Sequence, residues 1–150
     1  MAGSSNHHHD PFDLERFEVV QKDRYAAALT ELRCGAKRTH WMWFVFPQFK
    51  GLGASHQSEH FAIKSLKEAH AYLAHPVLRP RLRECCILLM DWTHLSVSDI
   101  LGSPDDLKLR SSMTLFELVD APGGVFSQVL DAFFDGQRDD RTLRLAGGRA

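Results

Sequence analysis

The sequence has no excess of charge, no long apolar run and no cysteine framework. Lys and Arg number 18 against 19 Asp and Glu, so the overall field favours neither a nucleic-acid polymer nor a membrane as partner. No stretch reaches the ~18 consecutive apolar residues of a transmembrane helix, and no secretory leader is visible. The 3 cysteines form no C-x-x-C pair, which argues against a disulfide framework and favours a reducing compartment, the cytoplasm.

The common signatures of catalysis are missing as well. The chain contains no G-x-S-x-G nucleophile elbow and no P-loop, and its cysteines and histidines form no convincing nucleophilic pair. The sequence therefore defines neither a reaction nor a cofactor, and it leaves the oligomeric state open.

Helical patterning covers most of the 150-residue chain. Apolar residues recur at helical spacing in short segments that are bounded by Ser, Asp, Gly and Pro. We expect an all-α fold, a single multihelical globular domain of about seven short helices spanning residues 10–146. Residues 1–9 include His7 to His9 and are expected to be a disordered tail or an artificial remnant, so they are excluded from the site.

Capping residues predict where the helices begin and end. Asp10-Pro11 begins a first helix that reaches about residue 21, and Gly35 ends a second one that covers 24–33. Ser65 and Glu68 form a predicted capping box, Ser96 is expected to cap a short turn that ends at Gly102, and Ser103-Pro104 begins a later helix. Further helices are expected over 58–64, 65–74, 78–92, 103–119, 125–134 and 140–145. The segment 78–92 is the most apolar of these and is expected at the centre of the core.

The run from Trp41 to Phe46 fits either a buried strand or a buried helical turn, because six bulky apolar residues precede Pro47. No neighbouring segment alternates apolar and polar residues to supply a partner strand. We therefore expect helix or irregular structure here, with any strand confined to this block.

The segment 37–58 is the strongest candidate for a site, because it combines many aromatic residues with polar groups that add nothing to a core. A guanidinium at Arg38, beside indole rings, suits a phosphate or a planar base. Trp41 and Trp43 are two residues apart and must point to different sides, so one is expected in the core and the other at a pocket. The alternative is that Arg38 caps the preceding turn and His40 lies bonded in the core.

The helix that begins near Ser103 is expected to form the opposite wall. Lys108, Ser111 and Ser112 share one face of it, and each serine carries a propensity cost of about 0.5 kcal/mol inside a helix. The alternative explanation is close helix packing, with the hydroxyls bonded to carbonyls one turn earlier. We expect a small anionic or nucleotide-derived ligand to bind in a cleft between 38–53 and 103–116. The predicted ligand-binding residues are Arg38, His40, Trp41, Trp43, Gln48, Lys108, Ser111 and Ser112.

The chain resembles a bacterial family known as domain of unknown function 1810, sometimes labelled calpastatin-like. The motifs that carry the resemblance are Asp10-Pro11-Phe12, Lys37 with His40-Trp41-Met42-Trp43, Phe46-Pro47-Gln48, Gly51-Leu52-Gly53, Ala71-Tyr72-Leu73, His75-Pro76-Val77-Leu78, and Asp105, Lys108 and Ser111 to Phe116. The resemblance implies a compact, mostly helical bacterial domain, with no settled activity, cofactor or catalytic residue. A folded domain of this composition does not resemble a disordered protease inhibitor.

Two other functions are weighed beside ligand binding. The stretch from Ser58-Glu59-His60 to Leu82 is similar to helical N-glycosidases that act on ADP-ribose derivatives, and this similarity implies Glu59 as the acid. A protein-interaction module that uses exposed aromatic residues is the other alternative.

Two short patterns next to Glu59 favour ordinary structure over a ligand site. His56 to His60 matches the H-x-x-E-H arrangement of zinc peptidases, but the chain has 9 histidines, so we expect a surface helix start and no metal. Gly51-Leu52-Gly53 could offer backbone amides to a phosphate, but we expect an ordinary tight turn, because the third glycine and preceding strand of a dinucleotide-binding fingerprint are missing.

Overall fold

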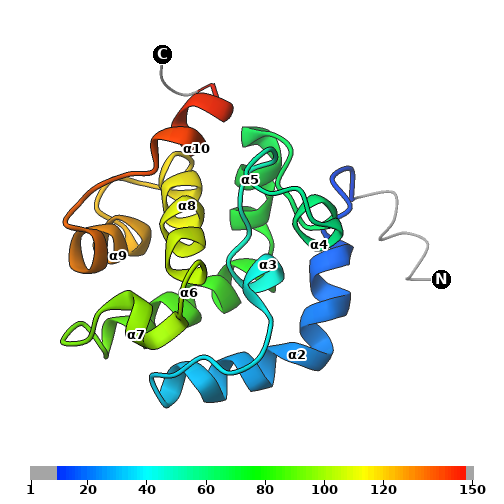
Figure 1. The fold of residues 1–150 in the computed structure, drawn as a ribbon. Coiled ribbons are helices and arrows are strands. Elements are labelled where there is room, and N and C mark those ends of the chain that lie inside the picture. Colours follow the sequence, from blue (N-terminus) through cyan, green and yellow to red (C-terminus); the bar gives the residue numbers. More distant parts are fainter. Residues whose placement is uncertain (1–9, 148–150) are drawn as a thin grey trace.

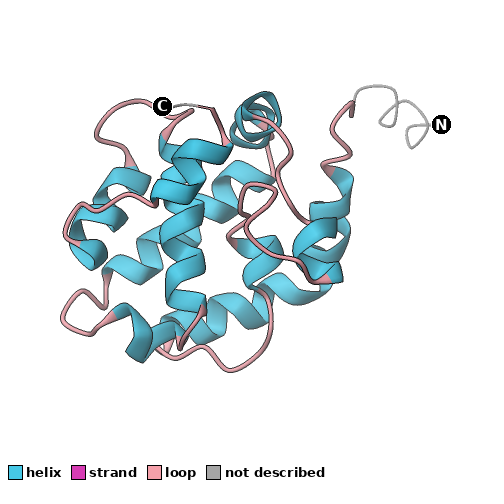
Figure 2. Cartoon of the chain, turned by 45° about the horizontal axis from the view of Figure 1, so that its top comes forward, coloured by secondary structure: helices cyan, strands magenta, loops and turns pink. Residues whose placement is uncertain are grey.

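The all-α prediction is confirmed. The computed structural model describes residues 10–147, and the expectations for residues 1–9 lie outside that range. Within it the structure has nine helices and no sheet (Figures 1 and 2). The helices are α2 (Glu15–Arg33), α3 (Met42–Val45), α4 (His56–His60), α5 (Leu66–Ala74), α6 (Leu78–Met90), α7 (Val97–Leu101), α8 (Asp105–Glu117), α9 (Val125–Phe134) and α10 (Asp140–Leu145).

One continuous helix, α2, replaces the two short helices expected before Gly35. No Gly or Pro interrupts residues 21–24, so the helix continues through them. It begins at Glu15 rather than at Pro11. The carboxylate of Asp10 nevertheless caps this end, because it accepts hydrogen bonds from the backbone N–H groups of Leu14 (2.8 Å) and Glu15 (3.0 Å).

Helix α8 lies at the centre of the bundle. The sequence pattern predicts segment 78–92, which forms α6, in that position. Six consecutive α8 residues, 111–116, are buried, and a helix that is buried at successive positions is surrounded on all sides. It packs against α9, α10, α7, α5 and α3 (Figure 1). Helix α6 lies beside it and packs on α2 and α9, with five of its residues buried.

Serine caps explain most of the other helix starts. Ser65 accepts a hydrogen bond from the N–H of Glu68, and Ser96 accepts one from the N–H of Asp99, as the capping patterns predict. Ser55 caps α4 in the same way, three residues before the expected start. The cap predicted at Ser103 is wrong, because α8 begins one residue later than the pattern requires and no side chain caps it.

The aromatic run forms a single helical turn, α3, so the preference for helix over strand there is confirmed. Residues 10–147 contain no strand, and their isolated parallel bridge lies just after this run, between Phe49 and Ile63. Two backbone hydrogen bonds of 2.9 Å form it, from Lys50 N to Ile63 O and from Ile63 N to Gln48 O. We call residues 50–62 the closed loop, because its two ends meet at this bridge.

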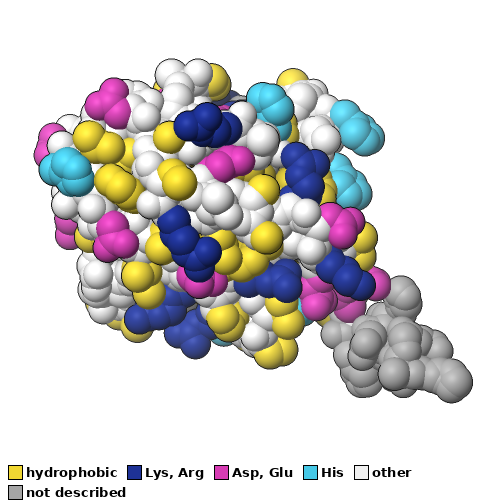
Figure 3. All heavy atoms as spheres, turned by 90° about the horizontal axis from the view of Figure 1, so that it is seen from below, with side chains coloured by type: hydrophobic (Ala, Val, Ile, Leu, Met, Phe, Trp, Pro, Cys, Tyr) yellow, Lys and Arg dark blue, Asp and Glu magenta, His cyan; other side chains and the backbone are white. Residues whose placement is uncertain are grey.

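The surface carries both signs of charge, and basic and acidic side chains are interspersed on the face in Figure 3. None of the helices in the described range is long and apolar enough to cross a membrane. The exposed large apolar side chains there are Val19, Ile87, Leu107, Leu118 and Leu145. The Phe, Tyr and Trp side chains of this range are buried or half-buried.

Candidate functional site

The aromatic segment is anchored by Glu31, near the end of α2. Glu31 is only 8% exposed, and its carboxylate accepts hydrogen bonds from the N–H groups of Arg38 (2.7 Å) and Thr39 (3.0 Å), the Thr39 hydroxyl (2.6 Å) and the Trp41 indole (2.8 Å). Burial alone would raise the pKa of Glu31, but these hydrogen bonds outweigh it and lower the pKa to about 2. Glu31 is therefore ionised, and its carboxylate holds residues 38–41 in place through these hydrogen bonds.

Of the two tryptophans of this segment, one lies in the core, as expected, and the other is partly exposed. Trp41 has no exposed surface and donates its indole N–H to Glu31, whereas Trp43 is half-buried. Trp43 is therefore the indole of this pair with more surface available to a ligand.

Two lysines from remote parts of the chain converge on Asp105, in the first turn of α8. The Nζ of Lys37 lies 2.8 Å from one carboxylate oxygen, and the Nζ of Lys108 lies 3.4 Å from the other. Each amine also lies 5.2 Å from an indole centroid, Lys37 over Trp41 and Lys108 over Trp43. We call Lys37, Trp43, Asp105 and Lys108 the lysine–indole cluster. Two positive charges and one negative charge give it a formal surplus of +1.

The two serines on the predicted wall lie inside the structure. Ser111 donates to the carbonyl of Leu107 (3.2 Å) and to Asp139 (3.0 Å), the residue that caps α10. This back-bonding agrees with the packing alternative. The hydroxyl of Ser112 is buried and has no hydrogen-bond partner within residues 10–147. Of the three residues predicted on this helix face, only Lys108 takes part in the lysine–indole cluster.

The remaining predicted residues lie on two different surfaces. Arg38 and His40 are exposed, so the alternative that places His40 in the core is wrong. The backbone carbonyl of His40 accepts a hydrogen bond from Arg24 (3.2 Å). Gln48 is half-buried and lines a small hollow of about 170 Å³ beside the Gly51-Leu52-Gly53 turn.

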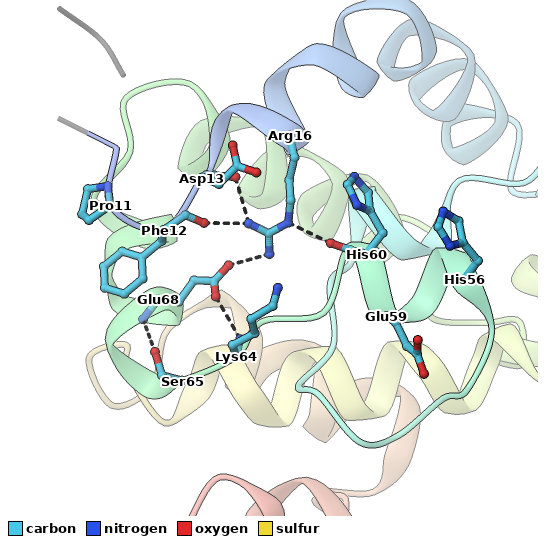
Figure 4. A pocket seen from close by; sticks show the side chains of 10 residues that line it. All are labelled: Pro11, Phe12, Asp13, Arg16, His56, Glu59, His60, Lys64, Ser65 and Glu68. Carbon is cyan, nitrogen blue, oxygen red and sulfur yellow. Dashed lines mark hydrogen bonds and ion pairs between the residues drawn. The ribbon is translucent and has the colours of Figure 1, made fainter. Parts of the chain in front are cut away.

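A larger hollow of about 690 Å³ lies between the start of α2 and helices α4 and α5 (Figure 4). We call it the α4 hollow. Its lining residues are Pro11, Phe12, Asp13, Arg16, His56, Glu59, His60, Lys64, Ser65 and Glu68. Glu59 and Lys64 line both this hollow and the smaller one.

Arg16 builds the wall of the α4 hollow and has no donor left for a ligand. Its Nε donates to the carbonyl of His60, its Nη1 to those of Phe12 and Asp13, and its Nη2 to Ala62 and to the carboxylate of Glu68. These bonds, of 2.6–2.9 Å, use all five N–H groups of a guanidinium. The Arg16 and Glu68 side chains are only 6% and 2% exposed, so the pair is structural.

The α4 hollow differs from the lysine–indole cluster in the sign of its charge. Asp13, Glu59 and Glu68 are acidic and Arg16 and Lys64 are basic among its lining residues, which gives a formal charge of −1 with neutral histidines. An anion is therefore favoured at the cluster, and a cation is favoured in the hollow.

A third hollow and an acidic group lie at the start of α2. The hollow, of about 960 Å³, runs along α2 and the segment 71–81. Carboxylate oxygens of Asp10, Asp13 and Glu15 lie within 4.8 Å of one another. Since Asp10 uses both of its oxygens to cap α2, this group has a structural explanation.

The comparisons with known proteins decide the family. A family model described as "Protein of unknown function (DUF1810)" matches residues 11–146. The protein belongs to the DUF1810 family. Its structure is similar to the crystal structure of the conserved hypothetical protein Rv1873 from Mycobacterium tuberculosis, with 48% sequence identity and a TM-score of 0.90. That match covers 92% of this chain and 99% of the other. The search of curated proteins gave no match.

In this DUF1810 protein, the fold brings together residues from segments that are remote in the sequence. Lys37 comes from one segment, and Asp105 and Lys108 come from another. Sequence reasoning missed Lys37, Asp105 and Glu31 as parts of the site. Glu31 did leave a signal, because a carboxylate in the last turn of a helix is opposed by the helix dipole and needs another reason to be there.

Proposed function

We propose that this DUF1810 protein binds a small anionic, nucleotide-derived ligand at the lysine–indole cluster, where segment 38–53 meets helix 103–116. The observation that carries the proposal is the convergence of Lys37 and Lys108 on the single carboxylate of Asp105. Because Lys37 and Lys108 share the single carboxylate of Asp105, one positive charge remains uncompensated. This charge lies next to the half-buried indole of Trp43. A phosphate group compensates such a surplus, and a planar base attached to it stacks on an aromatic ring.

Each member of the cluster has a distinct task in this proposal. Asp105 holds both amines in place before the ligand arrives. Lys108, which is more exposed than Lys37 (28% against 6%), turns from Asp105 to the phosphate. Trp43, which is half-buried, offers its ring to the base.

Binding is expected to depend on Lys108. A hydrogen bond to a charged group contributes about 1.5–3 kcal/mol, so Lys108→Ala should weaken binding roughly 10- to 100-fold. A panel of nucleotides and sugar phosphates is screened by thermal shift, and each binder is then titrated by calorimetry. Lys67→Ala removes an exposed lysine of α5 that lies outside the cluster, and it should bind like the parent. A panel without a binder, or equal affinities of the Lys108→Ala variant and the parent, would contradict the proposal.

An N-glycosidase acting on ADP-ribose derivatives is the second candidate. The observation that favours it is the position of Glu59, which is exposed and lines both the α4 hollow and the smaller hollow beside Gln48. A carboxylic acid at the junction of two cavities can protonate a leaving group as a general acid.

This candidate predicts turnover that depends on Glu59. The purified protein is incubated with ADP-ribosylated nucleotides, and free ADP-ribose is measured by chromatography. Glu59→Gln should lower the rate at least roughly 100-fold, as expected for loss of a general acid. Asp106→Asn, a change at a first-turn residue of α8 outside both hollows, should keep the parent rate. Absence of ADP-ribose with the parent protein would eliminate this candidate and leave the binding proposal standing.

A further inference from the structure

Two histidines lie side by side on one face of α4. His56 and His60 are one helical turn apart, and their imidazole rings are stacked with an interplanar angle of 10° and a centroid separation of 6.3 Å. Figure 4 shows both rings projecting from the same side of the helix at the edge of the α4 hollow. Both residues are exposed, so the rings are accessible from solvent.

Neither ring is needed to hold the fold through hydrogen bonds. The hydrogen bond that involves His60 runs from Arg16 to its backbone carbonyl, and the His60 ring packs edge-on against Phe61. Within residues 10–147, no hydrogen bond or ion pair is formed by a ring nitrogen of His56 or His60. Four imidazole nitrogens are therefore available at the edge of a hollow with a formal charge of −1.

We infer that His56 and His60 together bind one divalent transition-metal ion of the zinc and nickel type. Neutral imidazole is a preferred ligand of these ions, and no ring nitrogen of this pair is committed to a protein partner within residues 10–147. The site is separate from the lysine–indole cluster and does not depend on the function proposed there.

The spacing of the rings suits a shared ion. A zinc–nitrogen bond is about 2.0–2.1 Å long, so two nitrogens that share a tetrahedral ion lie about 3–4 Å apart. Rings whose centroids are 6.3 Å apart reach that separation by side-chain rotation, with no change in the helix. Figure 4 shows the carboxylate of Glu59 directed away from both rings. The site therefore differs from the zinc-peptidase arrangement, and water or a ligand in the hollow completes the coordination.

The test is an isothermal calorimetric titration of the 150-residue chain with Zn²⁺ alone. His7, His8 and His9 are replaced by alanine in every sample, because three adjacent histidines bind the same ions. One ion per chain is expected. His56→Gln and His60→Gln should each weaken binding at least roughly 10- to 100-fold, the loss caused even by outer-shell changes. His70→Gln removes an exposed histidine of α5 outside the hollow and should bind like the parent.

A paramagnetic probe locates the ion independently of affinity. Ni²⁺ should broaden the imidazole NMR signals of His56 and His60 together while leaving those of His70 and His94 sharp. The inference is overturned if the parent binds no Zn²⁺, if the double variant of His56 and His60 binds it equally well, or if the two rings take separate ions.

Discussion

Replacing Arg16 by methionine is expected to lower the free energy of unfolding by about 3–5 kcal/mol, the cost of breaking a buried ion pair from one side. The change leaves the carboxylate of Glu68, only 2% exposed, without its cation. It also removes the donors to four backbone carbonyls, two ahead of α2 (Phe12 and Asp13) and two at or just after the end of α4 (His60 and Ala62). Urea unfolding at pH 7 measures the effect as a lower transition midpoint.

Two further variants separate the charge from the loss of the side chain. Lys22→Met makes a similar change at an exposed position of the same helix and should alter stability by no more than about 0.5 kcal/mol. The double variant Arg16→Met with Glu68→Gln should recover part of the loss, because no buried charge is left unpaired. A single Arg16→Met variant within about 1 kcal/mol of the parent would show that the pair is not a stabilising anchor.

Glu31→Ala is expected to destabilise the protein by about 3 kcal/mol or more. The variant leaves four donors around the base of the aromatic segment without their acceptor, and the orphaned indole N–H of Trp41, which is buried, is especially costly. Asp23→Ala, at an exposed position of the same helix, is the matched control. Thermal and urea unfolding should both report the difference, and near-ultraviolet circular dichroism should show a changed environment for the tryptophans.

The stability that Glu31 contributes should also depend on pH. The pKa of Glu31 falls from an ordinary 4.5 to about 2 in the folded protein, a difference that corresponds to about 3 kcal/mol. Because the pKa is lower in the folded protein, the ionised carboxylate contributes its full stabilisation above about pH 4.5. This contribution is lost as the pH falls through the folded-state pKa. The difference in unfolding free energy between the parent and Glu31→Gln should therefore shrink between pH 5 and pH 2. A difference that stays constant over this range would contradict the assignment.

Local patterns in the sequence predicted the fold well wherever a helix end is set by its own neighbours. The caps at Ser65 and Ser96 and the end of α5 at His75 depend on residues within one turn, so the sequence contains the needed information. The continuity of α2 and the central place of α8 depend on packing against distant segments. Propensity is a weak guide there, because tertiary contacts override it.

The candidate site was predictable only in part, for the same reason. Composition located the segment around Trp43 and the helix with Lys108, and the structure places these two residues in contact. The same spacing that put Ser111 and Ser112 beside Lys108 could not show that α10 occupies that side of the helix. The role of Asp105 was also hidden, because a carboxylate in a first helical turn already has a sufficient local explanation in the helix dipole.

The closed loop has a consequence for how freely the region around α4 can vary. Its ends are joined at the bridge between Phe49 and Ile63, so changes in its length need not be transmitted to the rest of the bundle. Each doubling of such a loop costs only about 0.6 kcal/mol in chain entropy. Insertions and deletions near Ala54, which is exposed on the loop, should therefore be tolerated as long as the bridge forms, and the chemistry of His56 and His60 can diverge while the helical scaffold is retained.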